Sequence, residues 1–111
     1  MSAEEIGQYI ESGKKCHFVG IGGVSMSPLA EILYGMDINI TGSDMCENRA
    51  IRDLRAHGVN VTIGHSAANI SGAEYIIRTA AAREDNIEIV TAREQCIPLF
   101  ERAQAWGYIM R

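Results

Sequence analysis

Hydrophobic and polar residues follow two different patterns along this chain. Five short runs, at residues 16–21, 38–41, 59–63, 75–79 and 97–100, are either mostly apolar or strictly alternating. Runs of this length and composition predict buried strands. Between them, apolar residues recur every three to four positions, which is the spacing of one helix face. This helical periodicity predicts helices at residues 2–11, 26–36, 48–57, 87–95 and 102–110.

The ends of the predicted helices carry matching signals. Residues 2–5, Ser-Ala-Glu-Glu, form a capping box, and Pro28 falls in a first turn, where proline is tolerated. Gly58 follows one predicted helix as a stop signal, and Asp85 and Asn86 precede another as candidate caps. Residues 42–44, Gly-Ser-Asp, are expected to close the second strand. The boundaries therefore agree with the hydrophobic pattern.

Strands that alternate with helices at this spacing predict parallel strands joined by right-handed crossovers. We expect an α/β fold, a Rossmann-like doubly wound sheet of about five mainly parallel strands with flanking helices. No repeat or Pro/Gly-rich linker interrupts the 111 residues, so residues 1–111 are predicted to form a single domain.

Composition narrows the possible partners. The net charge is −4, and the 10 Lys and Arg residues are scattered, which argues against a nucleic-acid partner. No apolar run approaches the roughly 20 residues of a membrane helix, and the acidic N-terminus does not resemble a signal peptide, so we expect a cytoplasmic protein that does not enter a membrane. The three cysteines are far apart and form no metal-ligand pattern with the histidines, so we predict reduced thiols, with Cys16 buried in a strand, and no metal site.

The glycine-rich segment at residues 20–27, Gly-Ile-Gly-Gly-Val-Ser-Met-Ser, lies between the first predicted strand and the next helix. Glycine lets a backbone approach a ligand without a Cβ atom in the way. A helix that starts after such a loop presents unpaired N–H groups, which favour phosphate or diphosphate. Ser25 and Ser27 can add hydroxyl donors or cap the helix. The alternative is a tight strand-to-helix turn with no ligand.

The pattern alone leaves the kind of phosphate ligand open. Gly20 and Gly22 fit the first two positions of a dinucleotide fingerprint, Ser25 occupies the third, and Asp44 lies where a ribose-binding acid belongs. An NAD(P)-binding domain of an oxidoreductase or a regulatory protein is therefore one alternative. A non-catalytic interaction domain is another, although no exposed apolar stripe supports it. A GxxxxGK[ST] loop for ATP is absent from the sequence.

The order of these motifs resembles the N-terminal domain of the Mur ligases. The similarity runs through residues 17–27, 29–33, 42–44, 64–65, 85–89, 97–98, 102–103 and 109–111, and so covers essentially the whole chain. The resemblance implies a domain that binds UDP-N-acetylmuramate for peptidoglycan (cell-wall) biosynthesis in the bacterial cytoplasm. The residues resemble the alanine-adding branch of the family most, and the murein-peptide branch is the alternative.

In such enzymes, the resemblance implies, ATP and magnesium activate the muramyl carboxylate as an acyl phosphate, which the amine of L-alanine attacks. The central ATPase domain and the C-terminal domain of the family do not match any part of this sequence. We therefore expect a fragment of such an enzyme, with a natural stand-alone module as the alternative. We expect it to hold the UDP-sugar at a helix terminus, to bind no cofactor itself, to contain no catalytic residue and not to ligate alone.

The resemblance also implies a set of ligand-binding residues. Asp44 is expected to contact ribose or uracil, with a turn-forming role as the alternative. His65 follows the third strand, at the edge where ligands of doubly wound sheets collect, and is expected to contact the nucleotide or to stabilise its own turn. Arg102 is expected to contact the ligand or to pair with a nearby acid. The diphosphate is expected at the backbone of Gly20, Gly22, Gly23, Val24, Ser25, Met26 and Ser27 and beside Thr79, Ala80 and Ala81.

Overall fold

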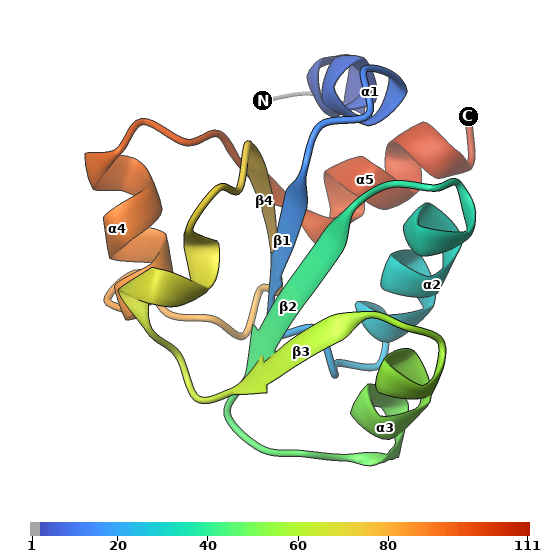
Figure 1. Cartoon of the computed structure of the whole chain (residues 1–111). Helices are drawn as coiled ribbons and strands as arrows, with labels where there is room; N and C mark the ends of the chain where they lie inside the picture. The colour runs from blue at the N-terminus through green and yellow to red at the C-terminus, as the bar shows by residue number, and fades with distance from the viewer. Residues whose placement is uncertain (1–2) are drawn as a thin grey trace.

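Five parallel strands form one sheet in the computed structural model, which describes residues 3–111 (Figure 1). Their order across the sheet is β3-β2-β1-β4-β5, so the chain moves outward from β1 to one edge, returns to the centre and moves to the other edge. This reversal between β1 and β4 makes the sheet doubly wound. The predicted fold class is confirmed, and all five strands are parallel rather than most of them. The strands are β1 (Cys16–Val19), β2 (Ile40–Asp44), β3 (Asn60–Ile63), β4 (Tyr75–Arg78) and β5 (Leu99–Glu101).

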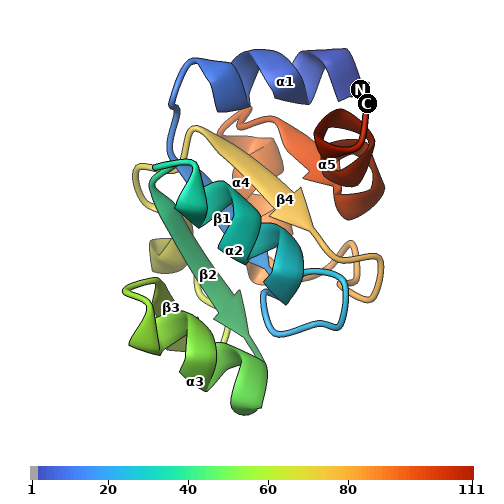
Figure 2. The same cartoon turned by 90° about the vertical axis from the view of Figure 1, so that its right-hand side faces the viewer.

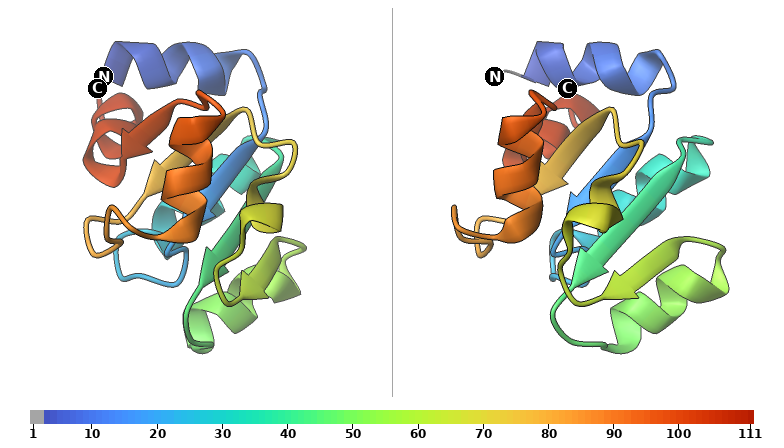
Figure 3. Two further views of the ribbon diagram at one scale, coloured as in Figure 1. Left: turned by 90° about the vertical axis from the view of Figure 1, so that its left-hand side faces the viewer. Right: turned by 60° about the vertical axis from the view of Figure 1, so that its left-hand side comes forward.

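Helices cover both faces of the sheet. One core contains side chains from α1, α2, α3 and α5 and from the strands, and Figure 2 shows α1 lying across α5. A smaller core on the opposite face lies beneath α4 and the 3-10 turn η1, which Figure 3 shows in front of the sheet. The helices are α1 (Ala3–Glu11), α2 (Ser27–Gly35), α3 (Arg49–Ala56), η1 (Ala67–Ile70), α4 (Ile87–Glu94) and α5 (Arg102–Ile109).

The end of β2 differs from the sequence-based expectation. Residues 42–44 do not close the strand but belong to it. Gly42 pairs with Phe18 of β1 on one side and with Val61 of β3 on the other, so the two neighbouring strands hold it extended. A Cβ atom on Gly42 would overlap Ile21. The glycine therefore allows the chain after β1 to cross close to β2, and it does not mark a turn.

Other boundaries shift by one or two residues. β1 ends at Val19, so the glycine segment begins directly at the sheet, and β5 starts at Leu99 rather than two residues earlier. η1 lies between the third and fourth strands, where the sequence pattern predicted no helix. The predicted cap at Asn86 is confirmed, because its side chain accepts a hydrogen bond from the Glu88 N–H at 2.9 Å. Ser2 of the expected capping box lies outside the described residues.

The structure also shows the state of the three cysteines and the length of the helices. Cys16 is buried in β1, as predicted, and Cys46 and Cys96 are exposed and also free. Within residues 3–111, no helix has the length and apolar character needed to cross a membrane.

Candidate functional site

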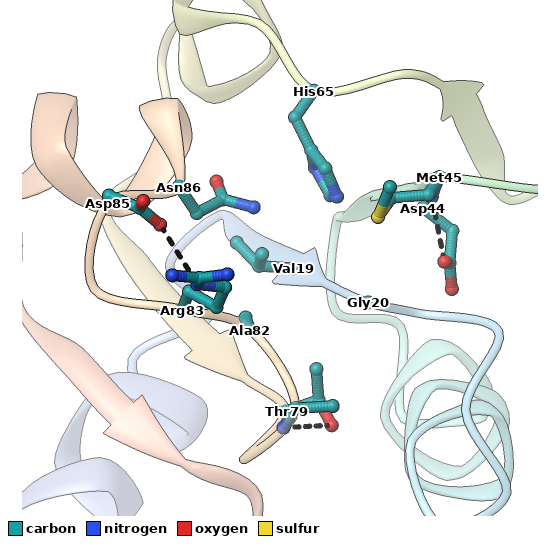
Figure 4. A pocket seen from close by; sticks show the side chains of 11 residues that line it. Val19, Gly20, Asp44, Met45, His65, Thr79, Ala82, Arg83, Asp85 and Asn86 are labelled. Carbon is teal, nitrogen blue, oxygen red and sulfur yellow. Dashed lines mark hydrogen bonds and ion pairs between the residues drawn. The ribbon is translucent and has the colours of Figure 1, made fainter.

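The carboxyl ends of the strands surround a cavity of about 310 Å³ at the point where the winding of the sheet reverses. Ligands of open α/β sheets bind in this crevice. Figure 4 shows His65 and Asp44 on one side of the cavity and the segment from Thr79 to Asn86 on the other. The cavity is lined by Val19, Gly20, Asp44, Met45, His65, Thr79, Ala81, Ala82, Arg83, Asp85 and Asn86.

The structure brings together only some of the residues predicted to bind the ligand. Gly20, Asp44, His65, Thr79 and Ala81 line the cavity. The remaining residues lie elsewhere: Met26 is buried in the core, Val24 is almost fully exposed, and Arg102 is half-buried at the start of α5. The predicted residues outside the cavity lining are Gly22, Gly23, Val24, Ser25, Met26, Ser27, Ala80 and Arg102.

Most backbone N–H groups of the glycine segment already have acceptors inside the protein. The first two donate to the Ser43 carbonyl, and those later in the turn donate to carbonyls within the segment itself. The Gly22 N–H donates to the Asp44 side chain, and among the described residues the N–H groups of Val24 and Ser25 have no acceptor in the protein. The expected diphosphate contacts through this backbone therefore depend on these two donors. The internal donors are Gly20 and Ile21 (to Ser43 O, 2.9 and 3.1 Å), Gly23 (to Gly20 O, 3.2 Å), and Met26 and Ser27 (to Gly23 O, 3.1 and 3.0 Å).

Asp44 fixes the shape of this segment. Its Oδ2 atom accepts a hydrogen bond from the Gly22 N–H at 2.9 Å, and its Oδ1 atom accepts one from the Met45 N–H at 2.8 Å. A Cβ atom on Gly22 would lie 2.9 Å from Asp44 Oδ2 and 2.9 Å from Ile51 Cδ1. The space left by the missing side chain is thus filled by the supports of the loop, not held open for a ligand. Asp44 combines the turn-forming role with a position on the cavity wall.

Trp106 of α5 holds the other side of the same segment. Its indole N–H donates to the Ser25 carbonyl at 2.9 Å, across 81 positions of sequence. No local signal in the sequence predicts this contact, because the apolar pattern shows only that Trp106 lies on a helix. The loop is therefore braced from β2 and from the C-terminal helix.

A buried glutamate lies behind the cavity. Glu88 is in the first turn of α4 and is fully inaccessible to solvent. Its Oε1 atom accepts hydrogen bonds from His17 Nε2 at 2.8 Å and from the Ser43 hydroxyl at 2.6 Å. His17 Nδ1 lies 2.8 Å from the Thr41 hydroxyl, and Nε2 also lies 3.3 Å from the Ser43 hydroxyl. Glu88 thereby joins α4 to β1 and β2.

The second oxygen of Glu88 reaches the loop after β3. Oε2 accepts hydrogen bonds from His65 Nδ1 at 3.1 Å, from the Ser66 N–H at 3.1 Å and from Asn69 Nδ2 at 2.8 Å. Burial acts to raise the pKa of this carboxyl, but the hydrogen bonds, first among them that from His17, outweigh burial and lower the pKa to about 2. Glu88 is therefore ionised at neutral pH and holds His65 through one ring nitrogen.

The comparison with known families decides the assignment of the fold. A sequence profile described as "Mur ligase family, catalytic domain" matches residues 15–111. The chain belongs to the Mur ligase family. It is 45% identical over 98 residues to the UDP-N-acetylmuramate–L-alanine ligase of Dechloromonas aromatica (strain RCB) and 46% identical over 98 residues to that of Aromatoleum aromaticum. These matches cover 88% of this chain but 21% of each relative, so the chain spans about a fifth of the length of these curated relatives.

Solved structures agree with this assignment. The UDP-N-acetylmuramate-alanine ligase from Thermotoga maritima superposes with a TM-score of 0.84 at 35% identity, covering 87% of this chain and 23% of that one. The UDP-N-acetylmuramate:L-alanyl-gamma-D-glutamyl-meso-diaminopimelate ligase from Neisseria meningitides superposes with a TM-score of 0.75 at 24% identity, covering 80% of this chain and 28% of that one, and so supports the fold alone.

Within this Mur ligase domain, the cavity also contains one cation that was not predicted from the sequence. Arg83 is the only Lys or Arg among the lining residues. Its Nε atom lies 3.6 Å from Asp85 Oδ1, and both side chains are largely exposed, so the pair is weak and the guanidinium remains accessible. A lone arginine in a polar loop carries no sequence signal. Its position at the cavity depends on the path of the chain after β4.

Proposed function

We propose that this chain binds UDP-N-acetylmuramate as the nucleotide-sugar-binding part of a longer ligase. In that enzyme, ATP and magnesium bound by other domains would activate the muramyl carboxylate for attack by L-alanine in cytoplasmic peptidoglycan synthesis. The observation that carries the proposal is the identity of 45% to a UDP-N-acetylmuramate–L-alanine ligase over nearly the whole of this chain. We assign no catalytic residue to this domain.

The chemistry of the cavity supports a nucleotide ligand. A volume of about 310 Å³ is at the lower end for small-molecule sites and suits the nucleotide part of a UDP-sugar better than the whole molecule. Met45 and Ala82 offer apolar surface, whereas His65 and Asn86 offer polar contacts for a base or a ribose. Arg83 offers a positive charge to a diphosphate, which arginine binds well.

Calorimetric titration of the 111-residue chain tests the proposal. UDP-N-acetylmuramate should bind, UDP should bind more weakly because it lacks the sugar contacts, and NADH should release no heat. Saturable binding of NADH with no response to UDP would refute the proposal in favour of the dinucleotide alternative. With ATP, magnesium and L-alanine added, the chain alone should release no phosphate.

A pair of arginine variants sharpens the test. Arg83→Gln should weaken UDP binding about tenfold and leave uridine binding unchanged, because only the diphosphate needs the charge. Arg93→Gln is the matched control, since Arg93 is an exposed arginine on α4 that pairs with Glu84 and does not line the cavity. Equal losses in the two variants would show that the effect is one of net charge.

A further inference from the structure

The two ring nitrogens of His65 have different surroundings. Nδ1 lies 3.1 Å from Ser43 Oγ and 3.1 Å from Glu88 Oε2. The ring lines the cavity and, in Figure 4, points into it between the strand ends. Among the described residues, none forms a hydrogen bond with Nε2. One nitrogen is therefore held by the protein and the other is left for a ligand.

The neighbours of Nδ1 determine where the proton of the ring lies. An ionised carboxylate only accepts hydrogen bonds, so Glu88 requires a proton on Nδ1. The Ser43 hydroxyl lies 2.6 Å from Glu88 Oε1 and donates its own proton there, so it too faces His65 as an acceptor. A neutral His65 therefore carries its proton on Nδ1 and a lone pair on Nε2.

The other ionisable groups nearby leave this arrangement in place. His17 donates its Nε2 proton to the opposite oxygen of Glu88, and its Nδ1 atom accepts from Thr41, so its needs are met without His65. Asp44, Arg83 and Asp85 line the same cavity, but no hydrogen bond or ion pair joins them to the ring of His65 within the described residues.

We propose that Glu88 is a positioning residue that fixes the Nδ1–H form of His65, so that Nε2 accepts a hydrogen bond from the bound nucleoside. The donor is an N–H or O–H group, either the imide of the base or a ribose hydroxyl. This inference rests on the proposed function for the identity of the ligand. The fixed proton position makes His65 selective for a donor, which discriminates against groups that only accept.

Nitrogen NMR of the histidine rings tests the first half of this inference. At about pH 8, where imidazoles are neutral, His65 in the wild-type chain should show a protonated Nδ1 and an unprotonated Nε2. Glu88→Gln should move part of the population to the Nε2–H form. The matched control is Glu31→Gln, because Glu31 contacts His57 Nδ1 at 2.9 Å in an exposed pair and should leave the His65 signals unchanged. A wild-type His65 protonated on Nε2 would overturn the inference, even if Glu88→Gln does not fold.

Titration with UDP tests the second half. Glu88→Gln and His65→Ala should each weaken UDP binding about tenfold. Because Glu88 acts through His65, Glu88→Gln should cause no further loss in a chain that already carries His65→Ala. A purely structural role would instead give an additional loss in the double variant and would overturn the inference.

Modified nucleotides identify the donor. If the base donates, N3-methyl-UDP should lose the contribution of His65, and if the ribose donates, a deoxy-UDP lacking the 2′ or 3′ hydroxyl should lose it. Equal sensitivity of all these ligands to His65→Ala would overturn the inference. Failure of the wild-type chain to bind UDP would refute the proposed function instead, and the NMR experiment would still report separately whether Glu88 fixes the proton of His65.

Discussion

Two histidine–glutamate pairs of this chain have nearly the same local geometry and opposite surroundings. His57 Nδ1 lies 2.9 Å from Glu31, and His65 Nδ1 lies 3.1 Å from Glu88. In the first pair the side chains are 58% and 36% exposed, and in the second they are 16% and 0% exposed. The comparison shows that burial, more than the contact itself, determines what such a pair does.

The reason is the cost of desolvation. An exposed carboxylate stays hydrated, so the gain or loss of one protein partner changes the free energy of unfolding little. A buried carboxylate loses its water and must find donors in the protein. Glu88 finds five, from β1, β2, the loop after β3 and η1. The exposed pair is a local contact, whereas the buried one joins four segments around the cavity.

Truncating the two glutamates should give the largest contrast. Glu88→Ala leaves several buried donors without an acceptor and should lower the free energy of unfolding by about 3–5 kcal/mol. Glu31→Ala should lower it by less than about 1 kcal/mol. Urea unfolding followed by the fluorescence of Trp106, the one tryptophan of the chain, measures both. A loss below about 1 kcal/mol for Glu88→Ala would contradict the contrast.

Lowering the pH should remove the stabilisation that the buried Glu88 contributes. A carboxyl whose pKa is lowered from 4.5 to about 2 on folding contributes about 3 kcal/mol to stability. This contribution is complete above the unfolded value and is lost as the pH falls from about 4.5 to about 2. The difference in unfolding free energy between wild type and Glu88→Gln should therefore shrink over this range. Other carboxylates cancel in the difference, and a difference that is constant with pH would show that folding does not lower the pKa of Glu88.

Salt should produce the smallest effect and act on the exposed pair. Raising the ionic strength from about 0.1 M to about 1 M shortens the screening length from about 10 Å to about 3 Å. The destabilisation caused by Glu31→Gln, a few tenths of a kcal/mol, should then disappear, whereas that caused by Glu88→Gln should remain. The same denaturation experiment at both salt concentrations measures this. Equal salt dependence would mean that the two environments are electrostatically alike.

Local patterns were enough to predict most of the fold. Strand runs and helix periods identified the elements, and the alternation of strands and helices predicted the parallel, doubly wound sheet. The position of His65 at the cavity followed from the same topology, because residues after parallel strands meet at one edge. The predicted end of β2 was wrong. Gly42 suggests a turn when only its neighbours in sequence are considered, but its pairing with β1 and β3 keeps it extended.

The burial of Glu88 could not be predicted from the sequence. A glutamate in the first turn of a helix is expected to be exposed, where it interacts favourably with the helix dipole. Only the packing of α4 against η1 and one face of the sheet buries it, and donors then reach it from β1, β2, the loop after β3 and η1. Arg83 is similar, since nothing in a polar loop predicts that it faces a cavity.

The sequence by itself determined the α/β architecture, the glycine segment and the similarity to Mur ligases, because these depend on short-range periodicity and on motif order. The tertiary structure alone decided which backbone donors stay available, which ring nitrogen of His65 faces the cavity, and that Glu88 is buried and charged. These properties depend on contacts between residues that are far apart in the chain, such as Ser25 with Trp106 and His17 with Glu88. Such contacts have no local signature, because each partner satisfies its own helix or strand pattern whether or not the other is present.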